Sequence, residues 1–288
     1  MGTLSEAGRG GGNEYMRWAG PPGTSDMTPE QIATASRAVV LALGDAYNRD
    51  AGTLRRARLL GISVWAFRVT GWAGPLGDVS AGTVTAALGL VAPDAVAEGW
   101  ETATRTVRPV EVAAVSLAEC CRWGDERLTA LPGVDRLAAL LVRVVAAADA
   151  TGMPLFAAWR AMPVPRDTPG ARAAVGLRLL REHILGGYLI ASRASGLSPL
   201  EALLAGGRGE ADAIACGWLP PYPPVGPLIR RQLRAEMVTD RLISTAFRAL
   251  SSREGIELVR LLNEARRHLT EPEVRRHLTG PGDRRQPD

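Results

Sequence analysis

Helix-start signals recur from one end of the chain to the other. Thr28-Pro29-Glu30-Gln31 combines an N-cap residue, a proline in the first turn and a glutamine in capping-box position. Thr168-Pro169 and Ser198-Pro199 repeat this start, and Ser251 with Glu254 forms another capping box. Most prolines stand between apolar runs, and no sustained apolar–polar alternation supports a strand. The chain is therefore predicted to be all-α.

The same capping residues and prolines set the expected helix bounds. We expect helices over residues 28–47, 53–72, 80–90, 93–106, 109–123, 134–150, 169–195, 198–204, 228–250 and 251–268, with a further start at 270–273. Segment 152–165 is predicted to be an apolar linker, and 206–212 a polar, glycine-rich loop. Residues 219–227 follow Trp218 with five prolines and are predicted to be extended loop.

These elements predict a multi-helix globular bundle with a C-terminal helical unit. The expected organisation is a disordered leader at 1–27, an N-terminal helical region at 28–165, a central helix with short helices at 166–218, a Pro-rich loop at 219–227, a C-terminal helical unit at 228–279 and a disordered tail at 280–288.

The charge pattern argues against a strong nucleic-acid surface. Every basic residue is an arginine, the formal net charge is only +4, and both signs are interspersed along the chain. A nucleic-acid footprint needs arginines gathered on one face. We expect weak, sequence-independent nucleic-acid binding at most, through clusters such as Arg230, Arg231 and Arg234. No apolar run is long enough for a membrane helix, and three cysteines form no disulfide framework, which favours a cytoplasmic protein.

The residues that could carry chemistry are few. The histidines are His183, His268 and His277, and none stands in a metal-binding motif, so no metal is predicted and the cofactor is unknown. Glu182 and His183 lie midway along the apolar helix at 169–195, with Gly186-Gly187 and Tyr188 following. Two glycines inside a helix indicate close approach of a backbone or a ligand. A tight helix crossing with a hydrogen-bonded core histidine is the alternative.

Five short motifs follow one another in a characteristic order. They are Gly74–Gly77, Gly152–Ala158, Leu180–His183, Gly217–Leu219 and Thr239-Asp240. In this order they resemble the actinobacterial helix-turn-helix family proteins, over about residues 30–265. The resemblance implies a helical N-terminal region and a C-terminal part like a winged helix. The abundance of Arg, Ala, Gly and Val is typical of a GC-rich genome, which agrees with that source.

Departures from the family pattern shape the functional prediction. The family carries polar residues where this chain has Arg37, Trp72, Trp159 and Tyr188. The interval between Leu197 and Gly217 is shorter than in the family, and it is rich in glycine and acidic residues. The resemblance therefore implies a more aromatic pocket and a degenerate recognition-helix region, so that the C-terminal unit resembles a degenerate winged helix.

Three classes of function stay open. The first is a small-molecule-binding or pathway-accessory protein; the second is an enzyme of specialised metabolism acting on an apolar substrate in an aromatic cavity; the third is a DNA-binding transcriptional regulator. For the first, an apolar or aromatic small molecule is expected in a cavity of ~300 Å³. The expected ligand-binding residues are Trp72, Trp159, Glu182, His183 and Tyr188. A homodimer is left open.

Overall fold

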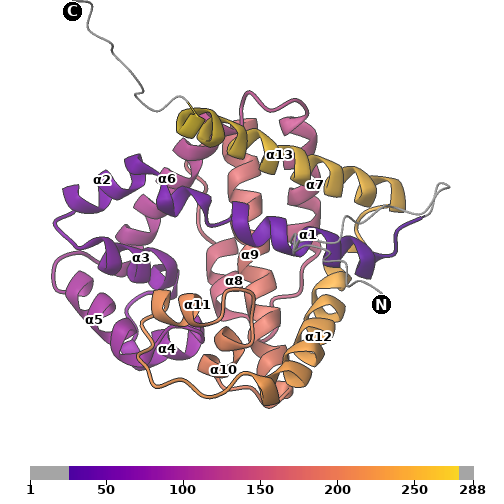
Figure 1. Cartoon of the computed structure of the whole chain (residues 1–288). Coiled ribbons are helices and arrows are strands. Elements are labelled where there is room, and N and C mark those ends of the chain that lie inside the picture. The colour runs from indigo at the N-terminus through magenta and orange to yellow at the C-terminus, as the bar shows by residue number, and fades with distance from the viewer. Residues whose placement is uncertain (1–25, 279–288) are drawn as a thin grey trace, which may run out of the picture.

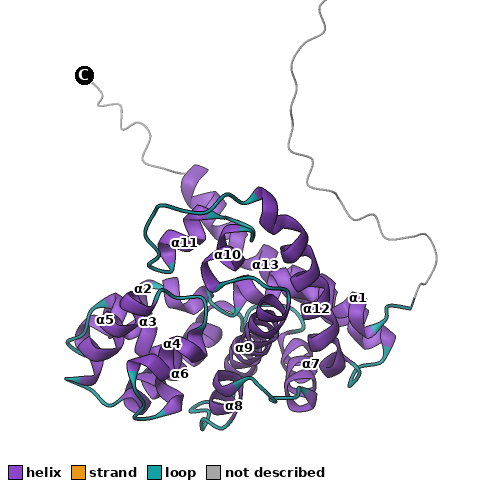
Figure 2. Ribbon diagram, turned by 90° about the horizontal axis from the view of Figure 1, so that it is seen from below, coloured by secondary structure: helices purple, strands orange, loops and turns teal. Residues whose placement is uncertain are grey.

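The computed structural model describes residues 26–278, and its side chains as far as residue 270. Within this part every regular element is a helix and none is a strand, which confirms the all-α prediction (Figures 1 and 2). The leader and tail predictions fall almost wholly outside the described residues. The helices are α1 (Pro29–Leu43), α2 (Ala51–Leu59), α3 (Val64–Ala73), α4 (Ala81–Leu88), α5 (Pro93–Thr104), α6 (Pro109–Arg127), α7 (Val134–Ala147), α8 (Pro154–Arg160), α9 (Pro169–Ala194), α10 (Pro199–Leu204), α11 (Glu210–Ala215), α12 (Ile229–Phe247) and α13 (Ser252–Leu278), with 3-10 turns η1 (Ala46–Arg49), η2 (Gly74–Leu76) and η3 (Gly226–Leu228).

The helix starts are capped as the sequence predicts. The Thr28 hydroxyl accepts a hydrogen bond from the Gln31 amide, and the Gln31 side chain accepts one from the Thr28 amide. Ser198 and Glu201 form the same reciprocal pair at α10. Each pair satisfies two amides that the helix itself leaves without partners. The bounds of these helices therefore follow from local sequence.

Four predicted segments are wrong in detail. The single helix expected at 53–72 is broken, because Gly61 adopts a positive φ of 72° and Ser63 caps a new helix. The linker expected at 152–165 contains α8, and the loop expected at 206–212 gives way to α11 from residue 210. No separate helix begins near 270, since α13 continues to Leu278.

Helix α9 is the central element of the bundle. It packs against α1, α6, α7, α8 and α12, and in both views it lies between the α2–α6 side and the α7–α12 side (Figures 1 and 2). Its crossing with α6 is close because Gly124 and Gly170 each present only backbone to the other. A side chain at either position would collide with the opposite carbonyl oxygen. The breadth of its apolar surface is thus explained by neighbours on most sides.

The C-terminal helices belong to the same core. Ile243 and Phe247 of α12 and Leu258 of α13 join the buried cluster that contains Leu177 and Leu180 of α9. Residues 219–225 are irregular, as expected for the proline-rich segment. None of the described helices is both long and apolar enough to span a lipid bilayer.

Candidate functional site

A buried carboxylate, that of Glu182, lies at the centre of the candidate site. Glu182 is 2% exposed and projects from the middle of α9. The indole nitrogen Nε1 of Trp72, on the last turn of α3, donates to its Oε2 at 2.7 Å. Nη1 of Arg181 donates to its Oε1 at 3.0 Å. Two donors thus compensate the carboxylate, which burial without partners would strongly disfavour.

Arg181 connects this carboxylate to the N-terminal helices. Its Nη2 lies 3.6 Å from Oδ1 of Asp45, and its guanidinium lies 5.0 Å from the centre of the Trp72 ring. Burial is the largest single influence on the pKa of Asp45 and would raise it. Arg181, together with the Asn48 hydrogen bond and the charges of Arg68 and Arg49, outweighs burial and holds that pKa below its ordinary value. Asp45, Arg181, Glu182 and Trp72 therefore form one connected chain of polar contacts from the start of η1 through α9 to α3.

A second polar group lies one helical turn before Glu182. Arg178 is 2% exposed; it donates to the Tyr47 hydroxyl and stacks over the Trp159 ring, 3.7 Å from the ring centre. Nε1 of Trp159 donates to the Trp72 carbonyl oxygen at 2.8 Å. Burial raises the pKa of Tyr47 to about 12, although Arg178 acts in the opposite direction. Trp159 thus contacts the backbone of Trp72 through its indole N–H, and the Arg178 guanidinium stacks on the Trp159 ring.

His183 lies in the adjoining core and stays neutral. Its ring centre lies 5.0 Å from that of Phe156, and the residue is 1% exposed. Burial lowers its pKa to about 4, because a charged imidazole would lose its hydration there. At neutral pH His183 is therefore uncharged and no ready proton donor, and its buried Nδ1 has no hydrogen-bond partner within the described part of the chain.

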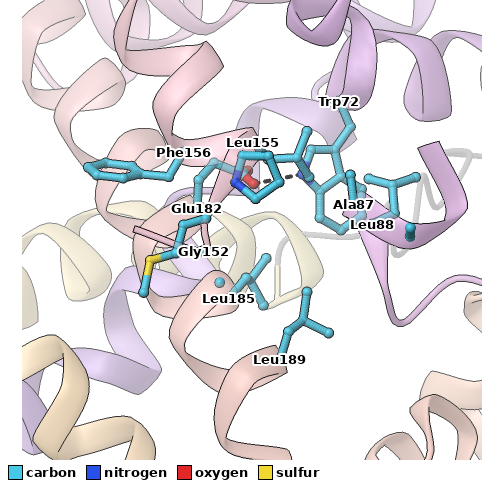
Figure 3. A pocket seen from close by; sticks show the side chains of 13 residues that line it. Trp72, Ala87, Leu88, Gly152, Leu155, Phe156, Glu182, Leu185 and Leu189 are labelled. Atoms are coloured by element: carbon cyan, nitrogen blue, oxygen red, sulfur yellow. Dashed lines mark hydrogen bonds between the residues drawn. The ribbon is translucent and has the colours of Figure 1, made fainter. Parts of the chain in front are cut away.

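A cavity of about 110 Å³ opens beside Glu182. Figure 3 shows the Glu182 carboxylate and the Trp72 indole at its wall, with Leu185 and Leu189 of α9 below them and Leu88 of α4 to the right. The rest of the lining is mostly apolar and comes from α4, α8 and α9. The sequence-based expectation of ~300 Å³ is wrong for this cavity, whose wall includes Met153, Leu155 and Phe156.

Only part of the predicted residue set meets at this cavity. Trp72 and Glu182 line it, whereas Trp159 and His183 lie behind its wall and Tyr188 points elsewhere. The Tyr188 hydroxyl lies 2.9 Å from Oε1 of Gln232, against α12. Each residue of an α-helix is rotated by about 100° from the one before it, so two residues six positions apart point about 120° away from each other. Glu182 and Tyr188 therefore cannot share a face of α9. Arg37, another departure from the family pattern, pairs with Asp240 of α12 at 3.2 Å.

The glycine pair on α9 serves helix packing. A Cβ added at Gly186 would lie 2.7 Å from Cγ of Met153, and one added at Gly187 would lie 3.0 Å from Cγ2 of Ile243. Gly187 therefore allows the close crossing of α9 with α12, as the alternative interpretation predicts. Gly186 admits the Met153 side chain and also lines the cavity beside Glu182. Within the described residues no cluster of three or more acidic, histidine or cysteine side chains could hold a metal ion.

Helices α2 and α3 form a compact pair that the sequence analysis missed. Residues 60–63 join them in a four-residue turn containing Gly61, and Ala57, Ile62 and Phe67 close a small buried cluster between them and their neighbours. Two helices joined by a short glycine-containing turn make a helix-turn-helix arrangement. Gly61 and Ser63, inside the segment read as one helix, were the available signal.

A family model described as helix-turn-helix family matches residues 33–221, more than half of the chain and a range that includes α2 and α3. The chain belongs to the helix-turn-helix family. No curated protein and no solved structure matches it.

In this helix-turn-helix family member, most of α3 is enclosed. Nε1 of Trp65 donates to the Ala95 carbonyl of α5 at 2.8 Å, and Val69 packs against Gly99 of the same helix. Trp72 is turned toward α9 by its bond to Glu182. A recognition helix reads bases with side chains that enter the major groove. Around the start of α3 only Ser63, Val64 and Arg68 are exposed, and α5 and α6 cover most of the rest of the helix.

Proposed function

We propose that this protein binds a compact, largely apolar small molecule in the cavity between α3, α4, α8 and α9, and that it does not read base sequence. One observation carries the proposal: the Glu182 carboxylate, almost fully buried, forms part of the wall of an otherwise mostly apolar cavity. An apolar pocket with a few convergent polar groups is the usual form of a small-molecule site.

The lining defines the chemistry of the ligand. Leu88, Leu185 and Leu189 offer apolar walls, and each oxygen of Glu182 accepts one hydrogen bond from the protein, leaving acceptor capacity on both. The volume of 110 Å³ is smaller than the cavity of about 150 Å³ that takes benzene in another protein. The ligand, or the branch of it that enters, is therefore small, apolar in its body and carries an amine, hydroxyl or amide donor.

Native mass spectrometry of protein purified from its own host tests the proposal. The wild type should carry an added small mass that denaturing conditions release. Ala87→Leu fills the cavity from α4 without removing a buried contact, and it should abolish the added mass. Ala211→Leu makes the same change at an exposed position of α11 and should retain it. Protein with no added mass, or equal retention by Ala87→Leu, contradicts the proposal.

A DNA-binding regulator is the second candidate, and the helix-turn-helix arrangement itself favours it. Arg55, Arg56 and Arg58 are exposed on α2, where they could meet phosphates. Phosphate contacts position a protein on DNA without reading sequence. The exposed part of α3 offers Arg68 as its single charged side chain, which supports at most limited reading of bases.

A further inference from the structure

A second, larger hollow lies on the other side of α9, where this helix crosses α7. The crossing is close, since a Cβ at Gly176 would lie 2.8 Å from Cβ of Leu141. Beside it, α7, α9 and the connection 161–168 enclose a groove of about 420 Å³. None of its lining residues belongs to the cavity beside Glu182. Its volume falls within the usual range for small-molecule sites, about 300–1,000 Å³.

The floor of this groove is apolar and partly open. Val145 and Val175 are buried beneath it and Leu179 is half-buried, whereas Val142 and Val164 are 50% and 48% exposed. Valines on facing sides of a groove leave apolar surface in water that an apolar chain would cover favourably. The floor therefore suits a hydrocarbon chain better than a polar ligand.

The rim carries more positive than negative charge. Arg160, Arg166 and Arg172 line the groove together with a single carboxylate, that of Asp167. Arg172 is the least engaged of the three arginines: its Nε lies 3.6 Å from Asp167 and its Nη2 lies 4.0 Å from Asp135. Both carboxylates are largely exposed, at 89% and 76%, and such pairs hold a guanidinium only weakly.

We propose that the α7–α9 groove binds an amphipathic carboxylate, with its apolar chain over the valines and its carboxylate on Arg172. A guanidinium recognises a carboxylate through two parallel hydrogen bonds, which gives the site direction as well as charge. A neutral hydrocarbon would leave the arginine rim unused, and a second copy of the chain would bring the same positive rim against it. The proposal is independent of the ligand proposed for Glu182.

Isothermal titration of the full chain with decanoate, below its micelle concentration, tests this site. Decanoate should bind, and decanol, which keeps the chain but lacks the charge, should bind at least about tenfold more weakly, as expected for loss of a charged hydrogen bond. Arg172→Glu should weaken decanoate binding by a similar factor, and Arg172→Lys should recover part of it. Arg230→Glu, the same change at an exposed site on α12, should leave it within about twofold.

A variant of the floor separates this groove from the cavity beside Glu182. Val142→Asp places a charge at a half-exposed position and should abolish decanoate binding while the helical circular dichroism spectrum is unchanged. Ala87→Leu, which fills the other cavity, should leave decanoate binding intact. Equal binding of decanol and decanoate, full affinity in Arg172→Glu or Val142→Asp, or loss of binding in Ala87→Leu would overturn the proposal.

Discussion

Glu182 depends on its donors more than on any apolar contact. A buried acceptor that loses its hydrogen bond costs about 1–3 kcal/mol, and a charged acceptor costs more than a neutral one. Trp72→Phe keeps an aromatic ring but removes the donor to Glu182, so it should lower the free energy of unfolding by about 2 kcal/mol in urea titrations. Trp65→Phe removes an indole bond to the neutral carbonyl of Ala95 and should cost about half as much. Equal losses in the two variants would show that the charge of Glu182 does not matter.

His183 gives the fold a dependence on pH below neutrality. Its pKa is about 4 in the folded protein and about 6.5 when unfolded. Above pH 6.5 the imidazole is neutral in both the folded and the unfolded state. Between pH 6.5 and 4 only the unfolded state takes up a proton, so the free energy of unfolding decreases as the pH is lowered. The loss should approach about 3 kcal/mol at pH 4. Urea titrations across this range should find a loss that is about 3 kcal/mol smaller in His183→Phe than in wild type or in His268→Phe, because carboxylates with lowered pKa values, such as Glu254, contribute equally to all three.

The sequence predicted some of the residues that meet at the site, and the angular positions of residues around α9 could have predicted which one would not. Glu182 and Trp72 were expected to meet, and they do, because a buried acid on an apolar helix requires a donor from a neighbour. Tyr188 could have been excluded by counting its rotation from Glu182 along α9. The size of the cavity could not be predicted, since it depends on how Met153 packs over Gly186. That contact joins segments with no local sequence relation.

At the scale of elements, capping signals predicted where most helices begin. Thr28 and Ser198 start α1 and α10 through local hydrogen bonds, which the sequence alone can reveal. The break at Gly61 was missed because apolar periodicity continues through it, and one glycine in a helical pattern is ordinarily tolerated. Helix α8 was missed because its flanking prolines resemble those of a linker.

The helix pair α2–α3 should contact DNA only through phosphates. Mobility shifts with the gene's own upstream region should show weak complexes that dissolve as salt rises and that scrambled DNA competes away equally. Arg55→Ala and Arg58→Ala should weaken these complexes to the same extent on every sequence, because both side chains lie on α2, where they meet phosphates. Phosphate contacts do not depend on base sequence. A tight complex with one sequence, lost in Arg68→Ala and surviving excess competitor, would establish base reading by α3.

The molecule as a whole should unfold in one step. The buried cluster that joins α12 and α13 to α9 leaves no boundary along which the C-terminal helices could separate. All seven tryptophans precede α12, so fluorescence reports the earlier helices, whereas circular dichroism reports them all.

Phe247→Ala, in the fully buried part of α12, tests this cooperativity. It should move both unfolding midpoints together, by a destabilisation of about 3–5 kcal/mol. Arg248→Ala, at the exposed neighbouring position, should move neither by much. A fluorescence midpoint that stays in place while the dichroism midpoint falls would instead show that 228–279 unfolds as a unit of its own.

The bond between Trp72 and Glu182 also bears on the order of events during folding. It joins residues 110 positions apart, whereas the helices around it are closed by contacts between near neighbours. Contacts of such long sequence separation carry a large loop-closure cost and form after local structure. An interaction that forms after the rate-limiting barrier lowers the rate of unfolding and leaves the rate of folding unchanged. The Trp72–Glu182 bond therefore lengthens the lifetime of the native state, whereas the local contacts within and between the helices set the folding rate.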